Sequence, residues 1–343
     1  MEHTHSVNRR TTDEQTDRLH DVVVIGGGAA GLNAALTLGR ARRTVLLIDA
    51  GQQRNAPAHS MHNYLGHEGI APADFLALAR REAARFGARS VQASVVSAKR
   101  ASKGHFEAVL DDDTVVRARR LLLTTGLADE LPDVPGLAER WAREVLHCPY
   151  CHGWEVRDRT IGVLSTGPVG VEQALLWSQW SSDITLFTHS GPPLDDAARA
   201  RLAARDIRVV EGLVAHLDVH GGRLRGVVLA DGPQREVALS HLVVAPRFTA
   251  RVEGLAGLDV QTTELWLFGQ LAGRYVVTNP QGATSTPGVY AAGNVTNLTE
   301  TAIGSAAAGL KAAAALNLDL ITEDTQRAID AAAPHGVRQG HRD

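Results

Sequence analysis

The feature that most constrains this chain is a glycine-rich turn between an apolar run and a helix-like segment. Residues 21–25 read as a buried parallel strand, residues 32–42 as a helix, and residues 44–48 as a second buried strand. The turn contains the small residues of a G-x-G-x-x-G pattern, namely Gly26, Gly28, Ala29, Ala30 and Gly31. Strand, glycine-rich turn, helix and strand in this order are typical of a dinucleotide-binding βαβ unit.

Each glycine of the pattern has a physical role in binding a dinucleotide. Gly26 permits the tight turn, Gly28 lets the backbone approach a pyrophosphate, and Gly31 lets the helix pack on the strand. The phosphates then bind free N–H groups at the N-terminus of the helix. Asp49 ends the second strand, where a carboxylate can accept hydrogen bonds from ribose hydroxyls.

The two cysteines of the chain, Cys148 and Cys151, form a C-x-x-C pair. Such a pair can cycle between dithiol and disulfide because its thiol pKa values are easily lowered. A structural disulfide stabilises most when it closes a long loop, and this loop is short. No second C-x-x-C follows to complete a zinc site, and His147 and His152 abut the cysteines too closely to share one ion with them. The sequence therefore favours a redox pair, and no metal site is predicted.

A second βαβ unit, residues 160–187, follows the cysteines with a weakened glycine pattern. Gly167 and Gly170 stand where the second and third glycines would, but Ser165 replaces the first. Pro168 also removes one N–H group from the anion-binding turn. After the second strand there is neither an arginine for the 2′-phosphate of NADP nor an acid for NAD. Tight binding of NADP(H) is therefore not expected.

Further candidates for cofactor contacts lie in a polar loop and at strand ends. Loop 54–69 is rich in Asn and His and could line a cofactor, or it is a solvated loop whose histidines are incidental. Strand-to-helix junctions, such as the one before an Ala-rich helix expected over residues 301–316, can present backbone donors to a phosphate or flavin. The candidates from these segments are Asn63, Thr125, Gly126, Gly293, Asn294, Thr301 and Ala302.

Composition excludes several classes of protein. A length of 343 residues with 44% hydrophobic and 21% charged residues favours two globular domains. The net charge of −3 does not suggest nucleic acid or an anionic membrane as a partner. No apolar run reaches the length of a membrane span, and residues 1–18 lack the apolar core of a secretory signal. We therefore expect a cytoplasmic protein, in which a C-x-x-C pair is more often catalytic than structural.

Taken together, these motifs resemble the low-molecular-weight thioredoxin reductase family of flavoproteins over residues 20–322. The likeness rests on Gly26-x-Gly28-x-x-Gly31, Thr124-Thr125-Gly126, Cys148-x-x-Cys151, the second βαβ unit and residues 289–294. It implies an α/β fold of two Rossmann-like (three-layer ββα) nucleotide-binding domains, the second inserted in the first. A homodimer is the family expectation.

The resemblance also implies domain limits. The FAD-binding domain comprises residues 20–145 and 247–322, and an NAD(P)-binding-like domain that carries the C-x-x-C pair comprises residues 146–246. Residues 1–19 are expected to form a disordered lead, and residues 323–343 a flexible tail.

Three departures separate this chain from the reductases. Asn294 stands where an aspartate is usual near the flavin, Glu300-Thr301 replaces an Arg-Gln pair, and His152 replaces the acid after the second cysteine. With its C-P-Y-C-H-G segment, the chain is more similar to the FAD-dependent dithiol oxidases. These oxidases close disulfides in natural products of the gliotoxin, holomycin and romidepsin type.

This resemblance implies an enzyme of antibiotic biosynthesis that oxidises a small-molecule dithiol, with FAD as cofactor, O₂ as electron acceptor and H₂O₂ as product. Cys148 would face the substrate and Cys151 the flavin, in one resting arrangement. His152, whose ordinary pKa of about 6.5 suits proton transfer near neutral pH, is the first candidate base. His147 is the second, or it is a structural hydrogen-bond donor.

Two other functions stay open. The first is an NADPH-dependent thioredoxin or disulfide reductase with a divergent site. The second is a redox sensor or protein-binding module without enzymatic activity that keeps FAD as a structural part. Tyr150, Trp154 and Trp177 are candidates for an apolar rim around a small substrate, or they are ordinary core aromatics.

Overall fold

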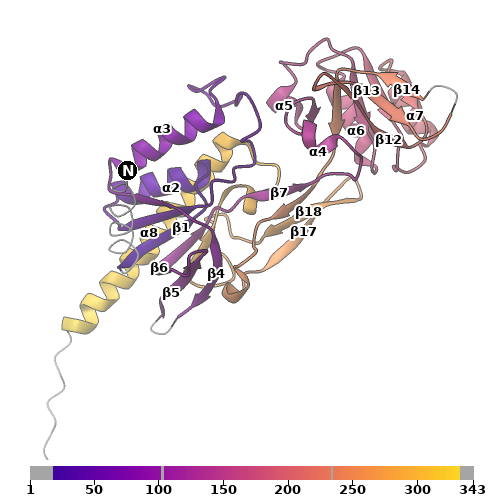
Figure 1. Ribbon diagram of the computed structural model, residues 1–343. Coiled ribbons are helices and arrows are strands. Elements are labelled where there is room, and N and C mark those ends of the chain that lie inside the picture. The colour runs from indigo at the N-terminus through magenta and orange to yellow at the C-terminus, as the bar shows by residue number, and fades with distance from the viewer. Residues whose placement is uncertain (1–17, 102–103, 233–234, 333–343) are drawn as a thin grey trace, which may run out of the picture.

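The computed structural model describes residues 18–101, 104–232 and 235–332 (Figure 1). One lobe is built from both ends of the chain, and the middle of the chain forms a second lobe with its own parallel sheet (Figure 1). The predicted α/β fold, with one Rossmann-like domain inserted in another, is confirmed. In the described part of the chain, no helix is both long and apolar enough to cross a membrane.

The sheet of the first lobe has the strand order β3-β2-β1-β6-β5-β4, with β19 paired to β6. Its parallel part consists of β1 (Leu19–Ile25), β2 (Val45–Asp49), β3 (Arg89–Gln92), β6 (Val115–Leu123) and β19 (Val289–Ala291). The antiparallel strands β4 (Val95–Arg100) and β5 (Phe106–Leu110) extend it. Ile25 pairs with Ile48 and with Leu123, so the glycine-rich turn and the ends of β2 and β6 meet at one sheet edge. Ligands bind at this carboxyl edge in open α/β sheets.

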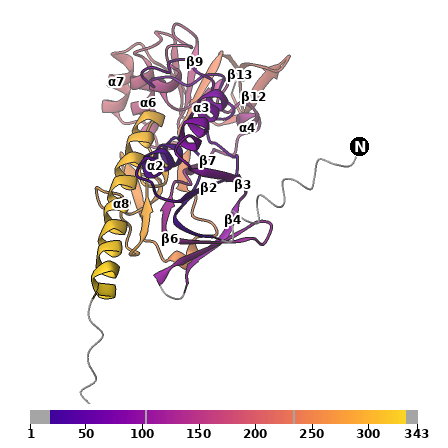
Figure 2. The ribbon, with the colours of Figure 1, turned by 90° about the vertical axis from the view of Figure 1, so that its left-hand side faces the viewer.

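Both faces of the first sheet are buried. Val22 and Val24 point to the helices α2 (Ala29–Arg40), α3 (Pro72–Ala84) and α8 (Ala302–Ala332). Val23 and Ile25 point to a second layer that includes the 3₁₀ helix η2 (Ala256–Leu258). Successive strand residues face opposite sides, which explains why the sequence of β1 is apolar throughout. Helices α2 and α8 lie side by side on the same face (Figure 2).

A four-stranded sheet joins the two lobes. Its order is β17 (Thr262–Leu267), β18 (Gln270–Val276), β16 (Arg247–Ala250) and β7 (Leu127–Glu130). Strand β7 leads out of the first lobe and β16 leads back into it, and the two pair antiparallel. The second lobe is therefore held by two adjacent strands.

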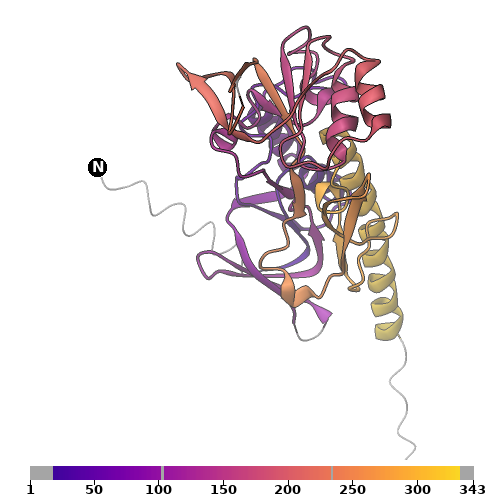
Figure 3. The ribbon, with the colours of Figure 1, turned by 90° about the vertical axis from the view of Figure 1, so that its right-hand side faces the viewer.

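The second lobe contains a parallel sheet and a small antiparallel one (Figure 3). The parallel sheet has the order β11 (Arg208–Val210), β10 (Ile184–Phe187), β9 (Ile161–Leu164), β15 (His241–Val244) and β8 (Val145–Leu146). The helices are α4 (Leu137–Arg140), α5 (Pro149–His152), α6 (Val169–Trp177) and α7 (Asp196–Ala203). The small sheet is formed by β12 (Val214–His220), β13 (Arg223–Leu229) and β14 (Glu236–Ala238).

Helix α8 is longer than the sequence predicts. The expected helix ended at residue 316, and the flexible tail predicted from residue 323 is wrong for residues 323–332, which continue α8. Ion pairs explain the difference, because Asp324 binds Arg43 and Arg119, and Glu323 binds Arg120. Residues 333–343 lie outside the described residues, as do residues 1–17 of the predicted lead, and Leu19 already begins β1.

Arg119 should be a main anchor of the C-terminal half of α8. Its side chain is only 10% exposed and lies 2.8 Å from Asp21 as well as against Asp324. Replacing it by methionine removes the more buried of the two cation contacts of Asp21 and Asp324 and leaves Arg43 as the other, so the free energy of unfolding should fall by about 2 kcal/mol. Urea denaturation measures this change.

Arg327→Met is the matched control for Arg119→Met. Arg327 binds Glu323 on the same helix, but its side chain is 55% exposed. An exposed pair of this kind contributes less than about 1 kcal/mol. Equal losses in the two variants would contradict the anchoring role of Arg119.

Candidate functional site

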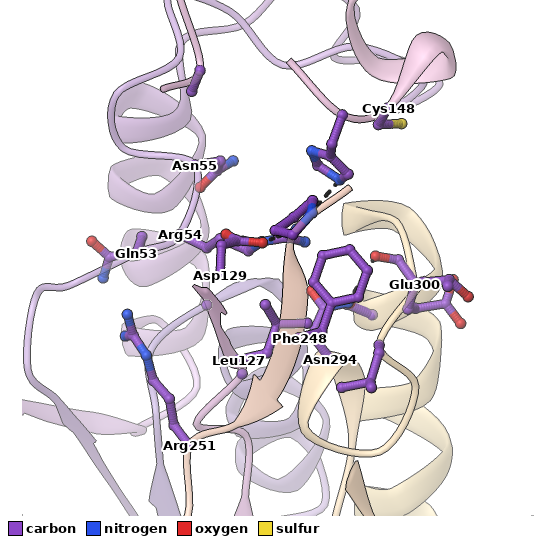
Figure 4. Close-up of a pocket in the computed structure, with 18 of the residues that line it drawn as sticks. Gln53, Arg54, Asn55, Leu127, Asp129, Cys148, Phe248, Arg251, Asn294 and Glu300 are labelled. Carbon is purple, nitrogen blue, oxygen red and sulfur yellow. Dashed lines mark hydrogen bonds and ion pairs between the residues drawn. The ribbon is translucent and has the colours of Figure 1, made fainter. Parts of the chain in front are cut away.

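The two predicted sites line a single cavity of about 1030 Å³. Residues of both lobes contribute to its wall. From the predicted site these are Gly26, Gly28, Ala29, Ala30, Asp49, Asn63, Thr125, Gly126, His147, Cys148, Cys151, His152, Asn294, Thr301 and Ala302. Gly31 and Gly293 do not line the cavity and lie behind its wall. Figure 4 shows Cys148 at the end of the cavity formed by the second lobe, with Arg54 and Asn55 on one side and Asn294 and Glu300 on the other.

The glycine-rich turn has the steric properties that the sequence predicts. Gly26 has φ +112°, and a Cβ atom there would lie 2.3 Å from the carbonyl oxygen of Thr124. A Cβ on Gly31 would lie 2.0 Å from the carbonyl oxygen of Gly26, so this glycine lets α2 approach β1. By contrast, no atom lies within 4 Å of a Cβ built on Gly28. The open space above Gly28, at the start of α2, fits a pyrophosphate.

Asp49 lies at the cavity wall with its carboxylate held by neighbours. It accepts hydrogen bonds from Gln53 (2.9 Å), Arg80 (2.6 Å) and the backbone N–H of Gly51 (3.2 Å). Gln53 makes a second contact at 3.2 Å, so each carboxylate oxygen has two hydrogen-bond contacts, and these orient the group at the cavity wall. The ribose contact itself stays a prediction.

Residues before α8 form the opposite wall. The Asn294 side-chain amide donates to the carbonyl oxygens of Asn297 (3.1 Å) and Glu300 (2.9 Å). The Glu300 carboxylate accepts from the N–H of Thr301 (3.1 Å), and the Thr301 hydroxyl accepts from the N–H of Gly304 (3.3 Å). Asn294 therefore shapes the loop that delivers Thr301 and Ala302 to the cavity.

The cysteines form a disulfide at the start of α5, with a Cα–Cα distance of 5.3 Å. Polar loop 54–69 holds this segment in place. Asn63, expected to contact a cofactor, donates its side-chain amide to the carbonyl oxygen of Tyr150 instead. Among the residues that the structure describes, no group of three or more His, Cys, Asp or Glu is arranged to hold a metal ion.

Arg54 joins the two lobes beside the cysteines, which the sequence does not reveal. Its guanidinium makes two hydrogen bonds to Asp129 (2.7 and 2.6 Å) and lies 5.1 Å from the ring centre of Phe248. It also contacts Nε2 of His147 at 3.3 Å, and this imidazole stacks on Trp141. No motif predicts such a cluster, because its members come from segments far apart in the chain.

The contact with Arg54 determines the state of His147. A guanidinium only donates hydrogen bonds, so Nε2 accepts from it and Nδ1 carries the ring proton. Burial, followed by the positive charges of Arg54 and His152, holds the pKa of His147 well below 6.5. The imidazole is neutral near pH 7 and its lone pair is engaged, which makes it a structural acceptor and a poor base. At Nε2 this ring accepts a hydrogen bond, and the structural donor that the sequence suggests can only be Nδ1–H.

His152 has a more suitable environment for accepting protons. Burial lowers its pKa below 6.5, the charge of Glu155 opposes this, and His62 lowers it further. The ring is therefore neutral and free to accept a proton near pH 7. Of the three aromatic candidates for a substrate rim, Tyr150 and Trp154 are exposed, whereas Trp177 is fully buried in the core of the second lobe.

The family described as pyridine nucleotide-disulphide oxidoreductase matches residues 20–317. The chain belongs to this family. Members of the pyridine nucleotide-disulphide oxidoreductase family that are similar to it are of the thioredoxin reductase type. Thioredoxin reductase tcpT of Claviceps purpurea is 34% identical over 292 residues, which cover 81% of this chain and 87% of the relative.

Solved structures agree with this assignment. The crystal structure of HlmI has a TM-score of 0.84 at 43% identity, and the match covers 92% of this chain and 96% of HlmI. An oxidoreductase from Agrobacterium tumefaciens has a TM-score of 0.82 at 37% identity, covering 89% and 99%. The predicted resemblance to low-molecular-weight thioredoxin reductases is confirmed. The family implies FAD, whose phosphate and flavin positions fit the turn at Gly28 and the loop before α8, so the chain is an FAD-dependent thiol–disulfide oxidoreductase.

The depressed pKa of His147 predicts a pH effect on stability. Above pH 6.5 neither the folded nor the unfolded state protonates this imidazole. As the pH falls below about 6.5, only the unfolded state takes up the proton, so stability is lost down to the lower pKa of the folded state. His147→Gln removes this contribution, and its free energy of unfolding should fall less between pH 7 and pH 5.

Urea denaturation at both pH values measures the effect. His59→Gln, the same replacement at an exposed position of loop 54–69, should keep the pH dependence of the unaltered chain. An unchanged pH dependence in His147→Gln would show that this imidazole is protonated in the folded protein.

Proposed function

We propose that the enzyme oxidises a small-molecule dithiol to an intramolecular disulfide and passes the electrons to O₂, forming H₂O₂. One observation carries this proposal. At the turn that would bind a nicotinamide dinucleotide, Gln270 lies against Gly167, the counterpart of Gly28, whereas the space above Gly28 is open and the redox cysteines line the same cavity. Electrons therefore have a route from the cysteines, while the pyrophosphate position for NADPH is obstructed.

Ser165 fills the inside of the nicotinamide-type turn. Its side chain is buried, and its hydroxyl donates to the carbonyl oxygen of Gly167 at 3.1 Å. A Cβ on Gly170 would lie 2.3 Å from this hydroxyl oxygen, and a Cβ on Gly191 would lie 2.4 Å from it. The two glycines thus accommodate the serine, in contrast to Gly28, above which the space is open.

The first lobe covers the same turn from outside. Gln270, at the start of β18, lies so close to Gly167 that a Cβ there would be 2.0 Å from its side-chain oxygen. A pyrophosphate bound at this turn would have to displace Gln270. The contact therefore supports an arrangement in which the second lobe stays in place with its cysteines at the cavity.

His189 stands after β10, where the 2′-phosphate of NADP would need a cation. Its Nδ1 accepts the backbone N–H of Val214 at 3.1 Å. Burial lowers the pKa of His189, so the ring is neutral near pH 7. This residue offers no positive charge to a phosphate, which speaks against the NADPH-dependent reductase.

The chain's own residues can carry out the exchange chemistry. A substrate thiolate attacks Cys148, Cys151 leaves as a thiolate, and the second substrate thiol resolves the mixed disulfide. His152 takes a proton from the reacting thiols, and the Arg54–His147 contact holds the backbone next to Cys148. FAD, when bound, accepts the two electrons from the cysteine pair and supplies the chemistry with O₂.

The proposed substrate is a dithiol metabolite of natural-product biosynthesis. The C-P-Y-C-H-G segment supports this substrate class because it resembles the same segment of the dithiol oxidases. His152 adds a chemical reason, because it can accept a proton from a substrate thiol. Exposed Tyr150 and Trp154, next to the cysteines, offer apolar surface for a small substrate. The alternative of a redox module without turnover has no observation in its favour.

Cys148→Ser tests the route of the electrons. The variant should lose O₂ uptake with dithiothreitol completely, because no disulfide remains to accept electrons from the thiolate. Its FAD absorbance should be unchanged, since Cys148 lies on the other lobe from the glycine-rich turn. An oxygen electrode and a flavin spectrum measure both. Continued O₂ uptake in the variant would contradict the proposed role of the pair.

Anaerobic bleaching of the flavin separates oxidase from reductase. In stopped-flow mixing, dithiothreitol should bleach the flavin of the unaltered chain, and NADPH should bleach it far more slowly because Gln270 lies against its binding turn at Gly167. Rapid bleaching by NADPH would refute the oxidase and establish the reductase.

We also propose a homodimer, as the family resemblance implies. Helix α8 leaves a row of apolar side chains exposed. They lie close to one face of the helix because the spacings between them are near multiples of about 3.6 residues. They are Ile303, Leu310, Leu318, Ile321 and Ile329. A second copy of the chain can cover this face with the same surface, since twofold interfaces are self-complementary.

Light scattering after size-exclusion chromatography tests the homodimer. The unaltered chain should elute as a dimer, and Leu318→Glu combined with Ile321→Glu should be a monomer because two charges enter the apolar row. Leu65→Glu, at a side chain that is 90% exposed on another segment, is the control. A variant that remains dimeric would place the interface elsewhere.

A further inference from the structure

A cluster of titratable side chains next to the C-x-x-C pair has no role in the exchange described above. His62, on the polar loop of the first lobe, lies between Glu68 of its own loop and Glu155 of the second lobe. His62 and His152 line the same cavity as the cysteines. His62 and Glu155 both act on the pKa of His152, so they lie within electrostatic range of it.

The Nε2 lone pair of His62 faces a hydroxyl, which, unlike the guanidinium at His147, can rotate away and free the nitrogen for a proton. The Glu68 carboxylate binds Nδ1 at 2.7 Å and also accepts the N–H of Asn63 at 2.8 Å. These two bonds lower the pKa of Glu68, which is therefore an ionised acceptor, and Nδ1 carries a proton. Nε2 then accepts from the Ser60 hydroxyl at 3.0 Å, and Glu155 stands 3.4 Å away, ready to stabilise the ring once it is charged.

The exposure of these groups rises from the cavity to the surface. The His62 side chain is 15% exposed, Glu155 is 39% exposed and Glu68 is 65% exposed. His62 therefore lies between the cavity that the half-buried His152 lines and two carboxylates in contact with water. Its position matches that of a proton carrier between this base and solvent.

The exchange reaction needs such an exit. Oxidation of a dithiol by the Cys148–Cys151 disulfide breaks two substrate S–H bonds and the enzyme S–S bond, and it forms one substrate S–S bond. Two electrons pass to the cysteines. One proton protonates Cys148, and Cys151 remains a thiolate, so the other proton must leave the cavity.

We propose that His62 carries this proton from His152 to Glu155, Glu68 and the solvent. The inference deepens the proposed function and rests on it only in that the chain reacts with a dithiol. Nε2 of His62 takes up the proton on the cavity side. Nδ1 can release one to Glu68, and rotation of the ring then brings the remaining N–H back to the Glu68 side, so that one proton has left the cavity.

Proton release measured directly tests this role. The FAD-loaded protein is mixed anaerobically with dithiothreitol in weak buffer containing a pH-indicator dye, so that the appearance of the proton is followed by stopped flow. His62→Gln keeps a donor for Glu68 but cannot carry a proton. It should slow release by about 10-fold, less than the roughly 100-fold or greater loss expected for a direct base.

Two further variants make the result specific. His59→Gln, on the same loop but outside the cavity lining, should release the proton at the rate of the unaltered chain. His62→Ala should be slow in plain buffer and should recover when imidazole is added, because a diffusible base replaces the missing ring. A merely structural role of His62 would not be restored by imidazole.

Proton release in the His62 variants can support or overturn the role of His62 as a proton carrier. Unchanged release in His62→Gln, or His62→Ala with a normal flavin spectrum that imidazole does not restore, would overturn it. Should both His62 variants lose FAD, Glu155→Gln replaces them, since this surface carboxylate can be neutralised without altering the fold. Slowed release in Glu155→Gln would support the relay, and release as fast as in the unaltered chain would overturn it.

Failure of the relay and failure of the proposed function are distinguishable. Dithiothreitol reduces the enzyme disulfide whether the physiological reaction is that of an oxidase or a reductase. An unaltered chain that lacks O₂ uptake, together with slow proton release in His62→Gln, would refute the oxidase and keep the relay. Normal O₂ uptake by the unaltered chain, together with unaffected proton release in His62→Gln, would keep the oxidase and refute the relay.

Discussion

The guanidinium of Arg54 is the interaction on which the arrangement of the two lobes depends. It binds Asp129 of β7 and contacts Phe248 of β16, the two strands that connect the lobes. It also binds His147, the residue before the redox pair. The Asp129 side chain is only 7% exposed, so removing either charge would leave the other poorly solvated. The guanidinium of Arg54 thus holds three segments at the edge of the cofactor cavity. They are the connecting strands β7 and β16 and the start of the C-x-x-C segment.

This arrangement bears on the direction of electron flow that we propose for the cysteine pair. Asn63 holds the segment at Tyr150, and Gln270 contacts the second lobe at Gly167, so the two lobes touch on both sides of the redox pair. With Ser165 inside the turn and a neutral His189 beside it, the second lobe keeps the architecture of a nucleotide-binding domain with an altered turn. The proposed flow of electrons, from a dithiol through the cysteines to FAD, is consistent with these contacts.

The two histidines that flank the cysteine pair differ in the charged groups around them. They differ little in sequence context, and both have a pKa below the ordinary value because of burial. Only His147 lies against a guanidinium, which occupies its lone pair, whereas His152 lies near Glu155 and His62. We therefore propose that the same residue type acts as a structural acceptor at one position and as a proton acceptor at the other. The difference depends entirely on which charges the fold brings close.

Some parts of the site could be predicted from the sequence because short-range sterics controls them. The turn at Gly26, the close packing at Gly31 and the open space above Gly28 depend on residues near in the chain or on paired neighbouring strands. The redox pair needs only the spacing of Cys148 and Cys151. Local patterns of this kind, together with the apolar strands, predicted two βαβ units and a dinucleotide site, and the resemblance to a known flavoprotein family supplied the two-domain fold and FAD.

The tertiary structure alone decided the contacts between distant segments. Asn63 binds Tyr150 rather than facing only the cavity, and Trp177 packs in the core rather than at a substrate rim. Ion pairs with arginines of other strands extend α8 to Ala332, where composition indicated a flexible tail. Hydrogen bonds and desolvation depend on partners that are far apart in sequence and leave no periodic pattern there. The sequence by itself therefore determined the scaffold and the redox pair, and the folded structure decided which charged groups surround that pair.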